Sequence, residues 1–79
     1  MVAGERHTPS RIPEVAADLA DTFARTAAAL EASAAVADQH AQRLDRAGRC
    51  HEATEERRVA QRARDAALQA FAYADSHRQ

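Results

Sequence analysis

Apolar residues recur at steps of four and three positions over one long stretch of the chain, from Ile12 to Ala47. The members of this pattern are Ile12, Ala16, Leu19, Phe23, Ala27, Leu30, Ala34, Ala37, Ala41 and Leu44. Their spacing is close to about 3.6 residues, the period of one face of an α-helix. No glycine or proline interrupts the run after Pro13. The pattern predicts one long, alanine-rich amphipathic helix that needs a partner surface along most of its length.

Local signals mark where this helix and a second one begin and end. Ser10 is a suitable N-cap residue, and it would place Pro13 in the first turn, where the missing N–H is tolerated. Gly48 follows the apolar run at the position where a left-handed residue commonly ends a helix. The polar start of the chain has no periodicity, which is typical of a flexible terminus. The predicted segments are an arm over residues 1–10, a first helix over 11–47, a turn over 48–50 and a second helix over 51–76.

The second helix carries its own apolar face, made largely of alanine. We expect this face to contain Val59, Ala63, Ala66, Ala67, Ala70 and Ala74, with Ala60 and Phe71 on its flank. Leu68 points away from it by roughly 130° on a helical wheel of 100° per residue. Leu68 is therefore either an exposed leucine or part of a second contact surface.

A short connection between two helices makes them antiparallel neighbours, so the expected fold is an all-α, two-helix antiparallel hairpin. Pairing from the turn would bring Phe23 near Ala74 and leave the first helix overhanging the second by about nine residues, or about 13 Å. Three large apolar residues would then lie on the overhang without an intramolecular partner: Ile12, Val15 and Leu19. An uncovered apolar end of this kind marks an interface.

We therefore predict that two hairpins form a homodimeric four-helix bundle. The predicted interface residues are Ile12, Val15, Leu19, Phe23 and Leu68. Two alternatives are that the overhang binds a different protein, or that its residues are simply exposed in a frayed first turn.

Composition supports association and limits the classes of partner. A 79-residue chain forms one small domain, and its 46% of hydrophobic residues are mostly alanine, so its core is thin. The net charge of −1 argues against a nucleic-acid-binding protein, which would carry a basic footprint. No apolar run approaches the roughly 20 residues that span a membrane. A single cysteine and a polar start without an apolar segment favour the reducing cytoplasm.

The one cluster of chemically capable side chains is predicted near the turn and contains His40, Cys50, His51 and Glu55. His51 and Glu55 are four residues apart, so one helix face could present both to a metal ion such as zinc. The chain lacks the spaced Cys or His motifs of established metal sites, and we expect no cofactor. It also shows no nucleophile–base pair and no phosphate-binding glycine loop. The sequence thus favours a non-enzymatic protein–protein interaction or regulatory module, with a metal- or ligand-binding bundle as the alternative.

Overall fold

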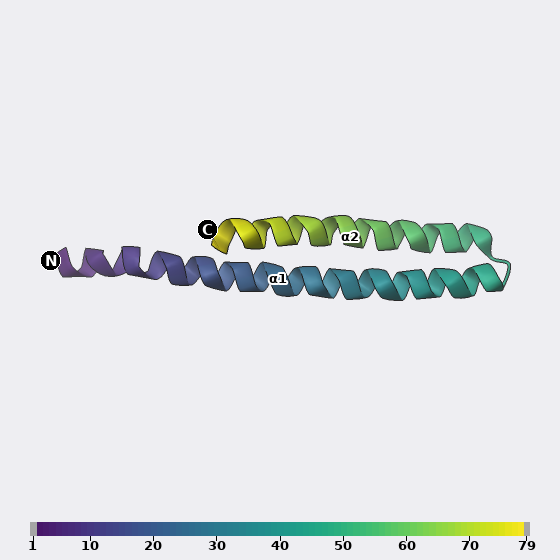
Figure 1. Cartoon of the computed structure of the whole chain (residues 1–79), viewed down its shortest axis with the longest axis horizontal. Helices are drawn as coiled ribbons and strands as arrows, with labels where there is room; N and C mark the ends of the chain where they lie inside the picture. Colours follow the sequence, from purple (N-terminus) through teal and green to yellow (C-terminus); the bar gives the residue numbers. More distant parts are fainter. Residues whose placement is uncertain (1, 79) are drawn as a thin grey trace.

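The computed structural model describes the backbone of residues 2–78 and the side chains of residues 13–78. Helix α1 covers Val2–Arg46 and helix α2 covers Cys50–Arg78, and the two lie side by side in opposite directions (Figure 1). The predicted all-α helical hairpin is therefore confirmed. The molecule measures 71 × 16 × 13 Å, and its radius of gyration of 19.6 Å far exceeds the about 12 Å of a compact chain of this length.

The turn between the helices is closed by backbone hydrogen bonds around Gly48. The Arg49 N–H donates to the Leu44 carbonyl at 2.8 Å, and the Gly48 N–H donates to the Asp45 carbonyl at 3.0 Å. This pair of bonds is the Schellman arrangement, which requires a left-handed residue after the helix. Gly48 supplies it with φ of 77°. The observed connection spans residues 47–49, one residue earlier than predicted.

The structure differs from the sequence prediction at the amino end, where residues 2–10 belong to α1 rather than to an arm. The sequence favoured a late start because Ser10 is a suitable N-cap and because Pro13, which removes one backbone hydrogen bond from a helix, is tolerated in the first turn. However, adding residues to the end of an existing helix avoids the unfavourable step of forming a first helical turn. Ala3, Glu5 and Arg6 are also good helix formers.

The seam between the helices is built from alanine at every seventh position. Ala20, Ala27, Ala34 and Ala41 of α1 meet Ala53, Ala60, Ala67 and Ala74 of α2, and all eight are at most 1% exposed. A seven-residue repeat is the pattern of helices that coil around each other. Within residues 13–78, ten of the eleven buried hydrophobic residues are alanine, and the other is Leu44. Small side chains at these positions allow the two helix axes to approach closely.

The buried faces are largely the predicted ones. The predicted residues that are buried are Ala27, Ala34, Ala37, Ala41 and Leu44 of α1 with Ala67, Ala70 and Ala74 of α2. Leu19, expected on the overhang without an intramolecular partner, is exposed. The prediction was wrong at Val59, which is exposed, whereas the adjacent Ala60, expected on the flank, is buried instead. The reason is steric, because the closely packed seam accepts a methyl group at this position but not a longer side chain.

As a result, the large apolar side chains lie mostly on the outside of the hairpin. The exposed ones are Val15, Leu19, Val36, Val59, Leu68, Phe71 and Tyr73. The molecule exposes 5,877 Å², whereas a typical compact monomer of 8.6 kDa exposes about 4,700 Å². The hairpin therefore exposes about 1,200 Å² more surface to water than a compact monomer of the same mass.

Candidate interaction surface

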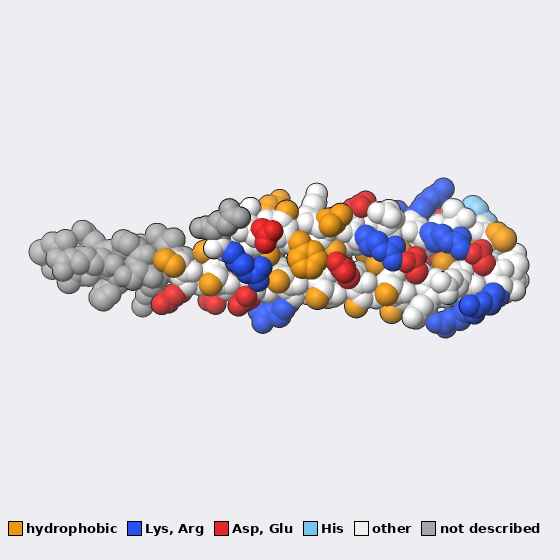
Figure 2. Space-filling model, viewed as in Figure 1, with side chains coloured by type: hydrophobic (Ala, Val, Ile, Leu, Met, Phe, Trp, Pro, Cys, Tyr) orange, Lys and Arg blue, Asp and Glu red, His pale blue; other side chains and the backbone are white. Residues whose placement is uncertain are grey.

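One flank of the seam carries charged pairs that join the two helices. Arg57 pairs with Asp45, and Arg64 pairs with Asp38 one heptad further along. Figure 2 shows basic and acidic side chains alternating along the joint between the helices. The groups are about one third to one half exposed, so each pair contributes only about 0.2–1 kcal/mol. Both pairs are compatible with the register in which α1 and α2 meet.

The opposite flank carries no charged side chain along the α1 stripe from Val15 to Val36, and we call this flank the uncharged face. Its α1 positions follow one another at steps of four and three residues, which makes a second heptad stripe beside the buried one. Among the side chains of residues 13–78 it includes five of the seven exposed large apolar residues, with Val36 63% and Val15 54% exposed. The uncharged face consists of Val15, Leu19, Thr22, Thr26, Ala29, Ser33 and Val36 of α1 with Val59, Ala66 and Tyr73 of α2.

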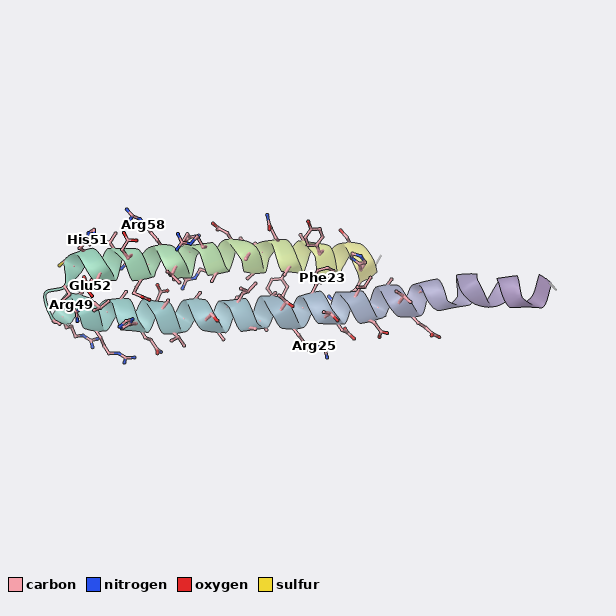
Figure 3. The ribbon with its side chains drawn as sticks, turned by 180° about the vertical axis from the view of Figure 1, so that it is seen from behind. Phe23, Arg25, Arg49, His51, Glu52 and Arg58 are labelled. Carbon is pink, nitrogen blue, oxygen red and sulfur yellow. The ribbon has the colours of Figure 1, made fainter. Side chains whose placement is uncertain are left out.

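An aromatic cluster anchors the end of α2 against α1 on this side of the seam. The ring of Phe23 lies 5.3 Å from that of Tyr73 and 5.5 Å from that of His77, centroid to centroid. Figure 3 shows Phe23 between the two helices. Phe23 is half-buried by these contacts, so its ring serves the hairpin itself rather than a free surface.

The structure separates the residues that were predicted to form one interface. Val15 and Leu19 are exposed on the uncharged face, and Phe23 is occupied within the hairpin. Leu68 is 67% exposed but lies on the other flank, where it lines a shallow groove with Glu31, Ala35 and Arg64. The side chain of Ile12 lies outside the described residues.

The projecting part of α1 is longer than predicted. The last turn of α2 reaches Asp21, whose carboxylate lies 3.7 Å from the Arg78 guanidinium. Residues 2–18 of α1 continue beyond this point for about 25 Å at 1.5 Å per residue. The difference from the predicted 13 Å arises because α1 begins at Val2 instead of residue 11.

The four residues proposed as metal ligands do not converge at the turn. His40 lies 3.6 Å from Glu56, whereas Glu55 is paired with Arg58. His51 and Cys50 are exposed, and His51 points away from α1 (Figure 3). Arg49 and Glu52 form a separate ion pair beside them. Among the side chains of residues 13–78, no group of three His, Cys, Asp or Glu is placed to hold a metal ion.

Two further results bear on the class of the protein. Neither helix, over the part of the chain that the structure describes, is long and apolar enough to cross a membrane. No protein-family model matches the chain, and comparison with curated proteins and with solved structures gives no similar protein. The uncharged face is therefore the feature of the molecule that bears most directly on its function.

Proposed function

We propose that this protein is a non-enzymatic protein–protein interaction module that acts as a homodimer, in which two hairpins pack through their uncharged faces into a four-helix bundle. One observation carries the proposal: alanine occupies the interior, while Val15, Leu19 and Val36 are exposed along a stripe that no charge interrupts. A protein that folded only for its own hairpin would place its larger apolar side chains in the seam.

The energetics of the hairpin favour such an association. Each buried alanine methyl contributes only about 0.8 kcal/mol, so a seam of ten alanines and one leucine stabilises the monomer weakly. The surface in excess of a compact monomer, about 1,200 Å², is larger than the about 800 Å² that each partner buries in a standard protein–protein interface. A second copy could therefore cover the uncharged face and still leave the charged flank in water.

The test compares two exchanges of the same kind on opposite flanks. Leu19→Asp introduces a carboxylate on the uncharged face, and Leu68→Asp introduces one beside the charged pairs. Light scattering coupled to gel filtration measures the molar mass of each, and circular dichroism at 222 nm verifies that each remains helical. We expect the wild type and Leu68→Asp to be dimers and Leu19→Asp to be a monomer.

Two outcomes would contradict the proposal. A monomeric wild type at tens of micromolar would exclude the dimer. A dimer that Leu19→Asp leaves intact and Leu68→Asp dissociates would place the interface on the charged flank instead.

A further inference from the structure

One edge of the uncharged face carries two opposite charges one heptad apart. Asp18 and Arg25 lie on the outer side of α1, next to the stripe that contains Leu19 and Thr26. Figure 3 shows Arg25 pointing away from α2. Within residues 13–78, neither Asp18 nor Arg25 forms an ion pair. Both charges are therefore available to a molecule that covers the uncharged face.

We infer that the covering molecule is a second copy in antiparallel orientation, in the register where Asp18 faces the partner's Arg25. The inference rests on the proposed homodimer and adds its geometry. In this register the two α1 helices overlap over their full length from Val2 to Arg46, and the two-fold axis passes near Ala24. Every residue pair then occurs twice, as a symmetric dimer requires.

The side chains of the uncharged face complement one another in size in this register. Leu19 lies opposite the partner's Ala29, and Val15 lies opposite the partner's Ser33. Near the axis, Thr22 lies opposite the partner's Thr26. A larger side chain thus meets a smaller one in the layers of Leu19 and Val15, and equal threonines meet beside the axis, which favours dense packing between the two helices.

Electrostatics distinguishes this register from its neighbours. In antiparallel coiled helices, residues that flank the seam pair diagonally across it and not with the residue directly opposite. Asp45 with Arg57 and Asp38 with Arg64 pair in this way inside the hairpin, and Asp18 would pair with the partner's Arg25 in the same way. A shift by one heptad in one direction would place Asp18 against the same residue of the second copy. A shift in the other direction would place Arg25 against its own equivalent. Of these three registers, only the fully overlapping one joins opposite charges.

The charge distribution along α1 also disfavours a parallel dimer. Glu14, Asp18 and Asp21 crowd the amino half of the described part of α1, and Arg43 and Arg46 lie in its last turn. Parallel packing would bring the acidic ends of two copies together, and like charges in proximity are destabilising. Antiparallel packing in this register keeps these acidic groups apart, because Glu14 lies opposite the partner's Ala34 and Asp21 lies opposite the partner's Ala27.

The native cysteine provides a direct measurement of orientation. Cys50 is the only cysteine and is exposed at the turn, away from the uncharged face. A nitroxide label on Cys50 of the full chain reports the distance between the two turns by pulsed electron paramagnetic resonance. In the antiparallel dimer this distance is the length of α1, about 66 Å at 1.5 Å per residue. A label pair closer than about 30 Å, in a chain whose mass is that of a dimer, would overturn the orientation without affecting the proposed function.

Charge exchange tests the register. We expect Asp18→Arg and Arg25→Asp each to weaken dimerisation about tenfold, because each turns two attractive contacts into repulsive ones. Combining the two exchanges in one chain restores opposite charges and should return the dissociation constant to near the wild-type value. Asp65→Arg, an equal change of charge on the outer side of α2, is the control and should have no effect. A double variant as weak as the single ones would refute the register, whereas a monomeric wild type would refute the proposed function itself.

Discussion

The exchange Ala60→Leu tests whether the alanine seam is as closely packed as the structure indicates. Ala60 is completely buried and packs with Ala34 and Ala37 of α1 and with the partly buried Ala63. Leucine adds three carbon atoms at a point where backbone and methyl groups of both helices already meet. The helices must separate locally, or the new side chain must adopt an unfavourable rotamer.

Overpacking of this kind costs typically about 1–3 kcal/mol. A 79-residue chain has a free energy of unfolding of about 4–12 kcal/mol, and this thin core belongs at the lower end. For a domain of this length, each 1 kcal/mol lowers the melting temperature by about 4–8 °C. We therefore expect Ala60→Leu to lower the melting temperature by about 5–20 °C.

The assay is thermal unfolding followed by circular dichroism at 222 nm, with all samples at the same chain concentration because association shifts the transition. Ala72→Leu is the matched control: the same exchange, made at an exposed position of α2. It should change the melting temperature by only a few degrees. If Ala60→Leu is as stable as the wild type or more stable, then the helices are not held at the distance that alanine permits, and the reasoning about the seam is wrong.

Three further exchanges test other parts of the fold, each by urea unfolding. Gly48→Ala should lower the free energy of unfolding by about 1 kcal/mol, because a φ of 77° strains any residue with a Cβ, although no atom crowds the site. An unchanged urea midpoint would contradict the left-handed turn. Phe23→Ala should cost about 2 kcal/mol through loss of its contact with Tyr73, the only tyrosine, whose fluorescence should change as well. Asp38→Asn should cost about 0.2–1 kcal/mol by removing the pair with Arg64, and 1 M NaCl should largely abolish the difference.

The sequence was sufficient to predict two antiparallel helices because apolar periodicity and a single glycine determine both. It also identified most of the inward side of each helix, since Ala34 and Ala41 of α1 and Ala67 of α2 were expected on the apolar faces and are buried. The prediction failed at Val59, which ranking by hydrophobicity placed inside because a larger apolar side chain gains more from burial. The structure buries the adjacent Ala60, because close approach of the axes is possible only where every seventh residue is small. The spacing of the eight seam alanines at intervals of seven was the signal that identifies this face.

Two other features could not be read from local patterns. The prolines at positions 9 and 13 argued for a late helix start, yet α1 extends through both of them. The uncharged face was missed because Thr22, Thr26 and Ser33 are not apolar, so a search for hydrophobic residues does not find the stripe. Its defining property is the absence of charge beside a few exposed apolar groups, which becomes visible only once the buried face is known.

The most direct test of the account is the molar mass of the unmodified chain in solution, measured by sedimentation equilibrium over a range of micromolar concentrations. We expect twice the 8.6 kDa of one chain, with dissociation on dilution. A mass of 8.6 kDa at every concentration would show that the hairpin is stable with its uncharged face in water, and would contradict the central claim.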